Sequence, residues 1–255
     1  MSWLELLALL AAGAAAGLIN TVVGSGTLVT FPTLLALGVP PVTANVSNTI
    51  GLVPGSVSGA LATRGELGGQ RSRLIRLGTA SLVGGIIGAL LLLKLPSSAF
   101  DTIVPVLIGI GCVLVVVQPW LSRRIAARRE RLGITESAPH GSIWLWIAVM
   151  LTGVYGGYFG AAQGVLLIGV LGIGLAEALQ RINAIKNVLA GLVNGVAGLI
   201  FVFLYDVNWW AAGAIAVGSV IGAQIGGRVG KKLPPLVYRI VIVGVGIVAI
   251  VNLLR

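Results

Sequence analysis

The sequence predicts an all-α polytopic membrane protein with two inverted-topology repeats, each made of a broken helical hairpin and three transmembrane helices. Three observations indicate this class. The 255 residues are 57% hydrophobic and only 9% charged, with a mean hydropathy of +1.04, whereas soluble domains carry roughly 25% charged residues. Several nearly uncharged stretches exceed the roughly 18 residues that cross a bilayer core as a helix. The alternating pattern of barrel strands does not occur, and helices satisfy their own backbone in lipid.

Ten apolar segments follow one another along the chain, and each is expected to be helical. A polar stretch at residues 122–140, containing "SRRIAARRERL", separates them into two groups of five and reads as a linker with a short solvated helix. We therefore expect a first repeat at 1–118, a basic cytoplasmic linker at 119–142 and a second repeat at 143–255. The segments are 3–23, 27–38, 42–63, 77–93 and 102–118, then 143–159, 161–178, 182–204, 209–227 and 236–254.

The first two segments form the predicted broken hairpin. The run from Trp3 to Gly38 would extend about 54 Å as one helix at 1.5 Å per residue, which is more than one crossing requires. It must fold back, and Gly24 and Gly26 in "GSGT" permit a tight turn, while Ser25 and Thr27 can cap the following helix. In the second half, "GGYFGAAQGVLL" supplies the corresponding breakers Gly160, Gln163 and Gly164.

An internal repeat supports the division into halves. "KLPSSAF" and "KKLPPLVY" place Lys94 over Lys232, and the same shift of 138 residues carries Asn45 onto Asn183 and Gly88 onto Gly226. A shift of 136 carries Gly24 onto Gly160. If each segment reverses the chain, fifteen Lys and Arg residues fall on the linker side and two on the other, which indicates a cytoplasmic linker. Five segments per half then invert the second repeat and place both termini on the outer side.

The two turns are the candidate functional site. Helices that begin at Thr27 and Gly164 would direct unpaired N–H groups and positive dipole ends at a common centre, an arrangement typical of transporters and suited to an anion. The next helices add the polar stretches "TANVSNT" and "RINAIKN". Tyr155 and Tyr158 approach the second turn. The expected substrate-binding residues are Gly24, Ser25, Gly26, Thr27, Asn45, Asn48, Gly160, Gln163, Gly164, Asn183, Lys186 and Asn187.

Simpler interpretations stay open for several of these residues. Glycines in membrane helices commonly serve packing, either within one chain or in a homodimer, and Asn side chains can bond between helices. Lys186 can snorkel to the cytoplasmic interface instead of meeting substrate. Glu177 and Arg181, four residues apart, read as an interfacial ion pair.

Other function classes lack their residues. Cys112 is the single cysteine and His140 the single histidine, and none of the seven acidic residues occupies an evident midplane position, so no catalytic set, metal site or buried carboxylate relay is visible. We expect no cofactor. The net charge of +10 lies in short loops, which indicates membrane orientation and not nucleic-acid binding. The expected partners are the lipid bilayer and a small anionic substrate.

The glycine-rich hairpin followed by an Asn-bearing helix, repeated across a basic loop, resembles the TauE/SafE family of sulfite and organosulfonate exporters. The resemblance covers the whole chain and is clearest in "AGLINTVVGSGTLVTFPTLLALGVPPVTANVSNT". It implies a secondary transporter that exports a small anion, such as sulfoacetate or sulfite, across the inner membrane by alternating access. The alternatives are an anion channel on the same scaffold, uptake of a small carboxylate or sulfur oxyanion, and a passive assembly protein.

Overall fold

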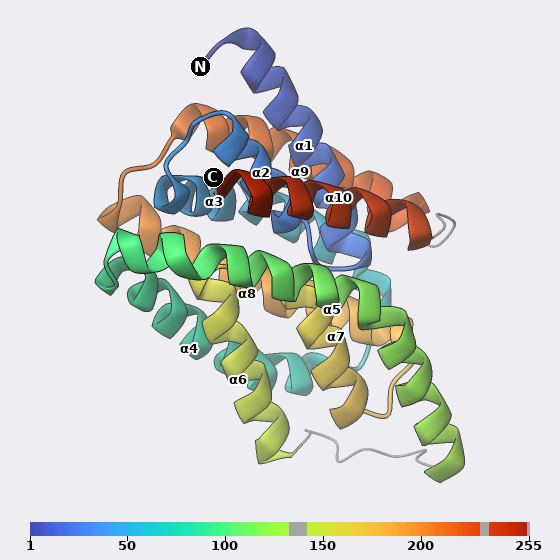
Figure 1. The fold of residues 1–255 in the computed structure, drawn as a ribbon. Helices are drawn as coiled ribbons and strands as arrows, with labels where there is room; N and C mark the ends of the chain where they lie inside the picture. Colours follow the sequence, from blue (N-terminus) through green and yellow to red (C-terminus); the bar gives the residue numbers. More distant parts are fainter. Residues whose placement is uncertain (133–141, 230–234, 254–255) are drawn as a thin grey trace.

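The computed structural model describes residues 1–132, 142–229 and 235–253, and these residues form α helices joined by short connections (Figure 1). No strand occurs among them. The first half contains α1 (Trp3–Val22), α2 (Thr27–Ala36), α3 (Pro41–Ala62), the 3₁₀ helix η1 (Arg64–Leu67), α4 (Arg71–Lys94) and α5 (Ser97–Leu132). The second half contains α6 (Ile143–Tyr158), α7 (Gln163–Gly174), α8 (Leu179–Leu204), α9 (Trp209–Val229) and α10 (Pro235–Leu253).

Five helices of the described chain are long and apolar enough to cross a membrane, as expected of a multi-pass membrane protein. They lie in both halves. Their outward faces carry exposed aliphatic side chains such as Ile86, Val113 and Ile221, which suit a lipid environment. The five spans are Trp3–Val22, Arg71–Lys94, Ser97–Trp120, Leu179–Leu204 and Trp209–Arg228.

Helix α5 differs from its predicted form. Its backbone stays helical from Ser97 through Pro119 to Leu132, so the short solvated helix expected inside the linker is a continuation of α5. The extension is rich in Ala, Arg and Leu, which are strong helix formers. Helix α4 also begins earlier than predicted, at Arg71. The remainder of the predicted linker, including His140, lies outside the described residues, as do the basic residues Lys231 and Lys232.

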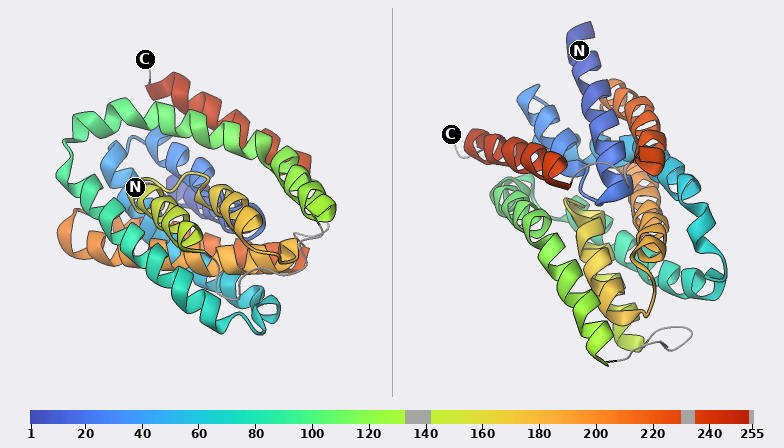
Figure 2. Two further views of the ribbon diagram at one scale, coloured as in Figure 1. Left: turned by 90° about the horizontal axis from the view of Figure 1, so that it is seen from below. Right: turned by 90° about the vertical axis from the view of Figure 1, so that its right-hand side faces the viewer.

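The two halves pack into each other. Helix α1 lies along α9 and α4 lies along α6, while α3 contacts α9 and α4 contacts α8 (Figures 1 and 2). Helices α5 and α10 lie together on one side of the molecule (Figure 2). Each contact has a counterpart with the halves exchanged: α1 on α9 corresponds to α6 on α4, and α2 on α10 corresponds to α7 on α5. The broken first helix of each half is therefore held mainly by the fourth helix of the other half.

Glycines make these close contacts possible. A Cβ atom added to Gly222 of α9 would overlap the Ala14 carbonyl of α1, and one added to Gly88 of α4 would overlap the Val154 carbonyl of α6. These glycines thus serve packing, as small residues in membrane helices commonly do, and bring the backbones of facing helices together.

Candidate functional site

Two sharp turns interrupt the hairpins near the centre of the molecule. Helix α1 ends at Val22 and α2 begins at Thr27, while α6 ends at Tyr158 and α7 begins at Gln163. Gly24 has φ +90° and Gly160 has φ +77°, backbone angles that glycine adopts without steric cost. Ala162 also has a positive φ, +58°, directly before α7. The expected positions of both breaks are therefore correct.

The two turns touch through their backbones. The N–H of Gly164 donates to the carbonyl of Gly24 over 2.9 Å. A Cβ atom added to either glycine would overlap the Cα of the other. The prediction that Gly164 presents an unpaired N–H is therefore wrong, because the opposite turn accepts its hydrogen.

Side chains outside the turns hold them in shape. Oδ1 of Asn20 accepts from the N–H of Gly26 over 2.7 Å, and the hydroxyl of Tyr155 donates to the carbonyl of Ala161. The expected cap by Ser25 and Thr27 does not form, since the N-cap of α2 is Gly26, which has no side chain to accept from the first N–H groups of the helix. Oγ of Ser25 is buried and makes no hydrogen bond within the described residues. Tyr158 does not face this centre but joins an aromatic cluster beyond it.

Lys186 is fully buried beside the turns. Its Nζ donates to the carbonyl of Asn20 over 2.7 Å and lies 3.5 Å from that of Thr21. These carbonyls belong to the last turn of α1, whose negative dipole end attracts a cation. In the described part of the chain, no carboxylate forms an ion pair with Lys186. The side chain thus binds the end of α1 at the centre and does not extend toward the linker side.

The four predicted Asn residues divide into two kinds. Asn48 is bound to helix α2, because its Nδ2 donates to Oγ1 of Thr27 over 3.3 Å and its Oδ1 accepts from Thr30. The others bridge the halves. Nδ2 of Asn45 donates to the Tyr158 carbonyl over 2.9 Å, Nδ2 of Asn183 donates to the Thr21 carbonyl over 3.0 Å, and Nδ2 of Asn187 lies 3.3 Å from Oγ1 of Thr63 and 3.4 Å from the Thr21 carbonyl.

A small cavity lies between the turns. Its volume is about 30 Å³, and one water needs roughly 10–15 Å³ on the same measure, so it admits water-sized groups in this conformation. Seven predicted site residues line it, whereas Ser25, Gly26, Asn45, Asn48 and Asn183 do not. The lining consists of Asn20, Thr21, Gly24, Thr27, Gly55, Ser56, Gly59, Gly160, Gln163, Gly164, Lys186, Asn187, Ala190 and Asn194.

Sequence reasoning missed half of this lining. Asn194 follows Asn187 by seven residues, so the two share one face of α8, and that spacing was a usable signal. Nδ2 of Asn194 donates to Oγ of Ser56 over 3.1 Å. Asn20 and Thr21 lie in the last turn of α1, directly before the predicted break. Their carbonyls contact Lys186, which lies far away in the sequence. The side chains that line the cavity include one cation and no carboxylate.

A larger cavity of about 310 Å³ adjoins the first and shares Thr21 with it. It extends from the end of α1 to the ends of α3, α8 and α9 that face the linker side. Oδ1 of Asn183 is buried and without a hydrogen-bond partner in the described structure, and the residue lines this cavity. The remaining lining residues are Val22, Ala62, Thr63, Gly65, Glu66, Gln118, Ile168, Leu179, Gln180, Gly226 and Gly227.

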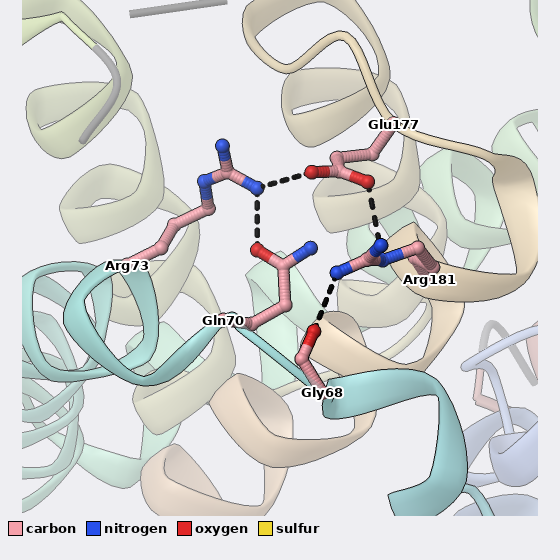
Figure 3. A network of polar contacts seen from close by, with 5 residues as sticks. All are labelled: Gly68, Gln70, Arg73, Glu177 and Arg181. Carbon is pink, nitrogen blue, oxygen red and sulfur yellow. Dashed lines mark hydrogen bonds and ion pairs between the residues drawn. The ribbon is translucent and has the colours of Figure 1, made fainter. Parts of the chain in front are cut away.

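A polar network lies on the same linker side (Figure 3). The carboxylate of Glu177 lies between Arg73, with N···O 2.7 Å, and Arg181, with N···O 3.1 Å, which confirms the expected ion pair of Glu177 with Arg181. Arg73 also donates to Gln70, and Arg181 donates to the carbonyl of Gly68 over 2.6 Å. Burial raises the pKa of the Glu177 carboxyl, but its bonds and charges with both arginines outweigh burial and lower that pKa overall.

Comparison with known proteins decides the family. The sequence profile described as "Sulfite exporter TauE/SafE" matches residues 9–253. The chain belongs to the TauE/SafE family. It is a membrane transporter and not an enzyme. Within the described residues, no group of His, Cys, Asp and Glu is placed to hold a metal ion.

Several relatives of the TauE/SafE chain are similar along most of their length. "Probable membrane transporter protein YfcA" of Escherichia coli is 27% identical over 86% of this chain and 79% of its own. "Probable membrane transporter protein ORF9" of Sinorhizobium sp. is 25% identical over 94% of this chain and 88% of its own. A probable membrane transporter protein of Haemophilus influenzae is 25% identical over 88% of this chain and 85% of its own.

Proposed function

We propose that this TauE/SafE chain is a secondary transporter that exports a small anion, such as an organosulfonate or sulfite, across the inner membrane. The observation that carries the proposal is the position of Lys186, a buried cation without an acidic partner in the described structure, beside two touching helix breaks. The family description names sulfite export. In this proposal the linker is cytoplasmic and both termini lie on the outer side.

The chemistry of the small cavity favours an anion over a cation or a neutral solute. Its polar groups are neutral amides, hydroxyls and the ammonium of Lys186. A buried charge is costly unless it is paired, and an anionic headgroup would pair with Lys186 and replace its carbonyl contacts. Asn187 and Gln163 would donate the further hydrogen bonds that an oxyanion accepts. A cation would meet an unpaired like charge here.

Alternating access is supported by the exchange of contacts between halves. Helix pairs recur when the halves are interchanged, as inverted-topology repeats require, and the two turns meet at the interface between them. Inverted repeats bind substrate at such an interface and expose it by moving one half against the other. The cavity of about 30 Å³ would widen when the substrate enters from the linker side.

Counterflow in proteoliposomes tests this proposal. Purified protein, loaded vesicles and labelled sulfite or sulfoacetate should give saturable exchange that occurs only against related anions, and Lys186→Gln should remove it. Sulfate and small carboxylates form the comparison panel. Conductance without saturation or counterflow would indicate the channel alternative, and exchange confined to carboxylates would overturn the assignment of sulfur oxyanions.

A further inference from the structure

Four aromatic rings fill the space next to the second turn, on the side away from the linker. Phe31 comes from α2, Phe100 from the start of α5, Tyr158 from the end of α6, and Phe159 from the turn itself. The ring centroids of Phe31 and Phe159 lie 5.1 Å apart, and those of Phe100 and Tyr158 lie 5.7 Å apart, in edge-to-face and tilted arrangements. Phe31, Phe100 and Phe159 are almost completely buried.

If each residue is replaced by its counterpart in the other half, the place of this cluster becomes the place of the cavity of about 310 Å³. Asn183 lines the cavity and donates to the last turn of α1; Asn45, its counterpart by the shift of 138 residues, donates to the last residue of α6, inside the cluster. Gly226 also lines the cavity, and its counterpart Gly88 packs against the backbone of Tyr158. Two equivalent places are therefore occupied differently: one holds about 310 Å³ of space, and the other holds four rings.

We infer that Phe31, Phe100, Tyr158 and Phe159 form the gate that closes the substrate site from the outer side, and that the structure represents the state open to the linker side. The inference rests on the proposed transport function. A hydrated anion cannot pass these packed rings, because it would have to lose its water among mainly apolar groups. The large cavity, in contrast, leads from the linker side to Thr21, at the edge of the site.

Polar atoms trapped beside the rings indicate that this closure is reversible. Oδ1 of Asn45 and the hydroxyl of Tyr158 are buried and have no hydrogen-bond partner among the described residues. Such atoms disfavour the closed arrangement relative to one in which water reaches them. The rings favour closure, and these atoms oppose it. Helix α2 carries Phe31 and is only ten residues long, so a small displacement of this helix would open the gate.

A matched pair of cysteines tests the gate without measuring transport. The native Cys112 is replaced by Ala, and Asn45→Cys or Asn183→Cys is introduced at the two equivalent positions. Labelling with a membrane-impermeant maleimide is then compared between right-side-out and inside-out vesicles. We expect Asn183→Cys to react from the linker side and Asn45→Cys to be protected from the outer side. Adding Phe31→Leu or Phe100→Leu should speed outer labelling of Asn45→Cys by about tenfold or more, because the closed state loses ring contacts.

Phe203→Leu is the control, since Phe203 lies on α8 and is 76% exposed; it should leave both labelling rates unchanged. Size-exclusion profiles establish that each variant is folded, and the leucine variants keep most of the packed volume. Rapid outer labelling of Asn45→Cys with all four rings intact would overturn the gate, as would unchanged protection in both leucine variants. The gate would stand if labelling behaves as expected while sulfite and sulfoacetate fail as substrates, so its failure and that of the proposed function are distinguishable.

Discussion

The backbone N–H of Gly164 donates to the backbone carbonyl of Gly24 over 2.9 Å, and this bond joins the helix breaks of the two halves. Neither residue has room for a side chain against the other. The contact fixes the distance between the two turns, so that residues from α1, α7 and α8 line one small cavity. The separation of the two turns is therefore set by a contact between backbones.

Gly24→Ala should prevent the turns from meeting. The variant combines a strained backbone angle with overlap against Gly164. Gly38→Ala is a matched control, because Gly38 also has a positive φ, +77°, but nothing lies within 4 Å of its added Cβ. Gly38→Ala should lose about 1–2 kcal/mol of stability, because alanine is strained in the left-handed region. Gly24→Ala should lose clearly more, because its Cβ atom also overlaps Gly164. Melting temperatures in detergent measure both, and equal losses would contradict the role of the contact.

Lys186→Gln should abolish anion exchange and lower stability. The variant removes the ammonium that binds the Asn20 carbonyl, and a hydrogen bond to a charged group contributes about 1.5–3 kcal/mol. Lys94→Gln is the control, since Lys94 is exposed at the end of α4. Counterflow and melting temperature are measured on the same preparations. Retained exchange in Lys186→Gln would show that the charge of this residue is not required.

We expect Asn187→Ala to reduce anion exchange and Asn48→Ala to reduce stability. Asn187 lines the small cavity, so its loss should reduce exchange by about tenfold, the equivalent of roughly 1.4 kcal/mol. Asn48 bonds to two threonines of α2 and does not line the cavity, so its loss should lower the melting temperature by an amount equivalent to about 1–2 kcal/mol. Intact exchange in Asn187→Ala, with Asn48→Ala losing exchange at full stability, would reverse this assignment.

The Glu177 carboxylate should make the stability of the folded protein depend on pH. Because its pKa is lowered in the folded protein, the carboxylate stabilises the fold above the ordinary pKa of 4.5, and this contribution is lost as the pH falls through the folded pKa. The difference in melting temperature between the native protein and Glu177→Gln should therefore shrink from about pH 6 to about pH 3. Asp206→Asn, in an exposed loop, is the control. A difference independent of pH would exclude the ion pairs with Arg73 and Arg181 as its cause.

Much of the chain's local structure could be predicted, because it depends on neighbouring residues. Apolar segment length and the glycines at 24 and 160 predicted helix ends within a few residues for most of the chain. The extension of α5 past Pro119 was missed, since one proline in a run of good helix formers did not end the helix. The division into a first repeat, linker and second repeat stays a prediction.

The partners of the polar residues could not be predicted in the same way. The sequence indicated that Asn45 and Asn183 occupy equivalent positions, but not that each donates to a helix end of the opposite half. Lys186 had two readings because its partners are main-chain carbonyls, which every residue has and which leave no pattern in the sequence. Such contacts depend on how the helices of the described chain are arranged in space.

The packing of α1 along α9 also bears on how the protein is made. A ribosome releases α1 long before α9 exists, so the first helix must wait in the bilayer without its main neighbour, and with the carbonyls of Asn20 and Thr21 lacking Lys186. The interior of the first half is therefore completed only after α9 of the second half has been made.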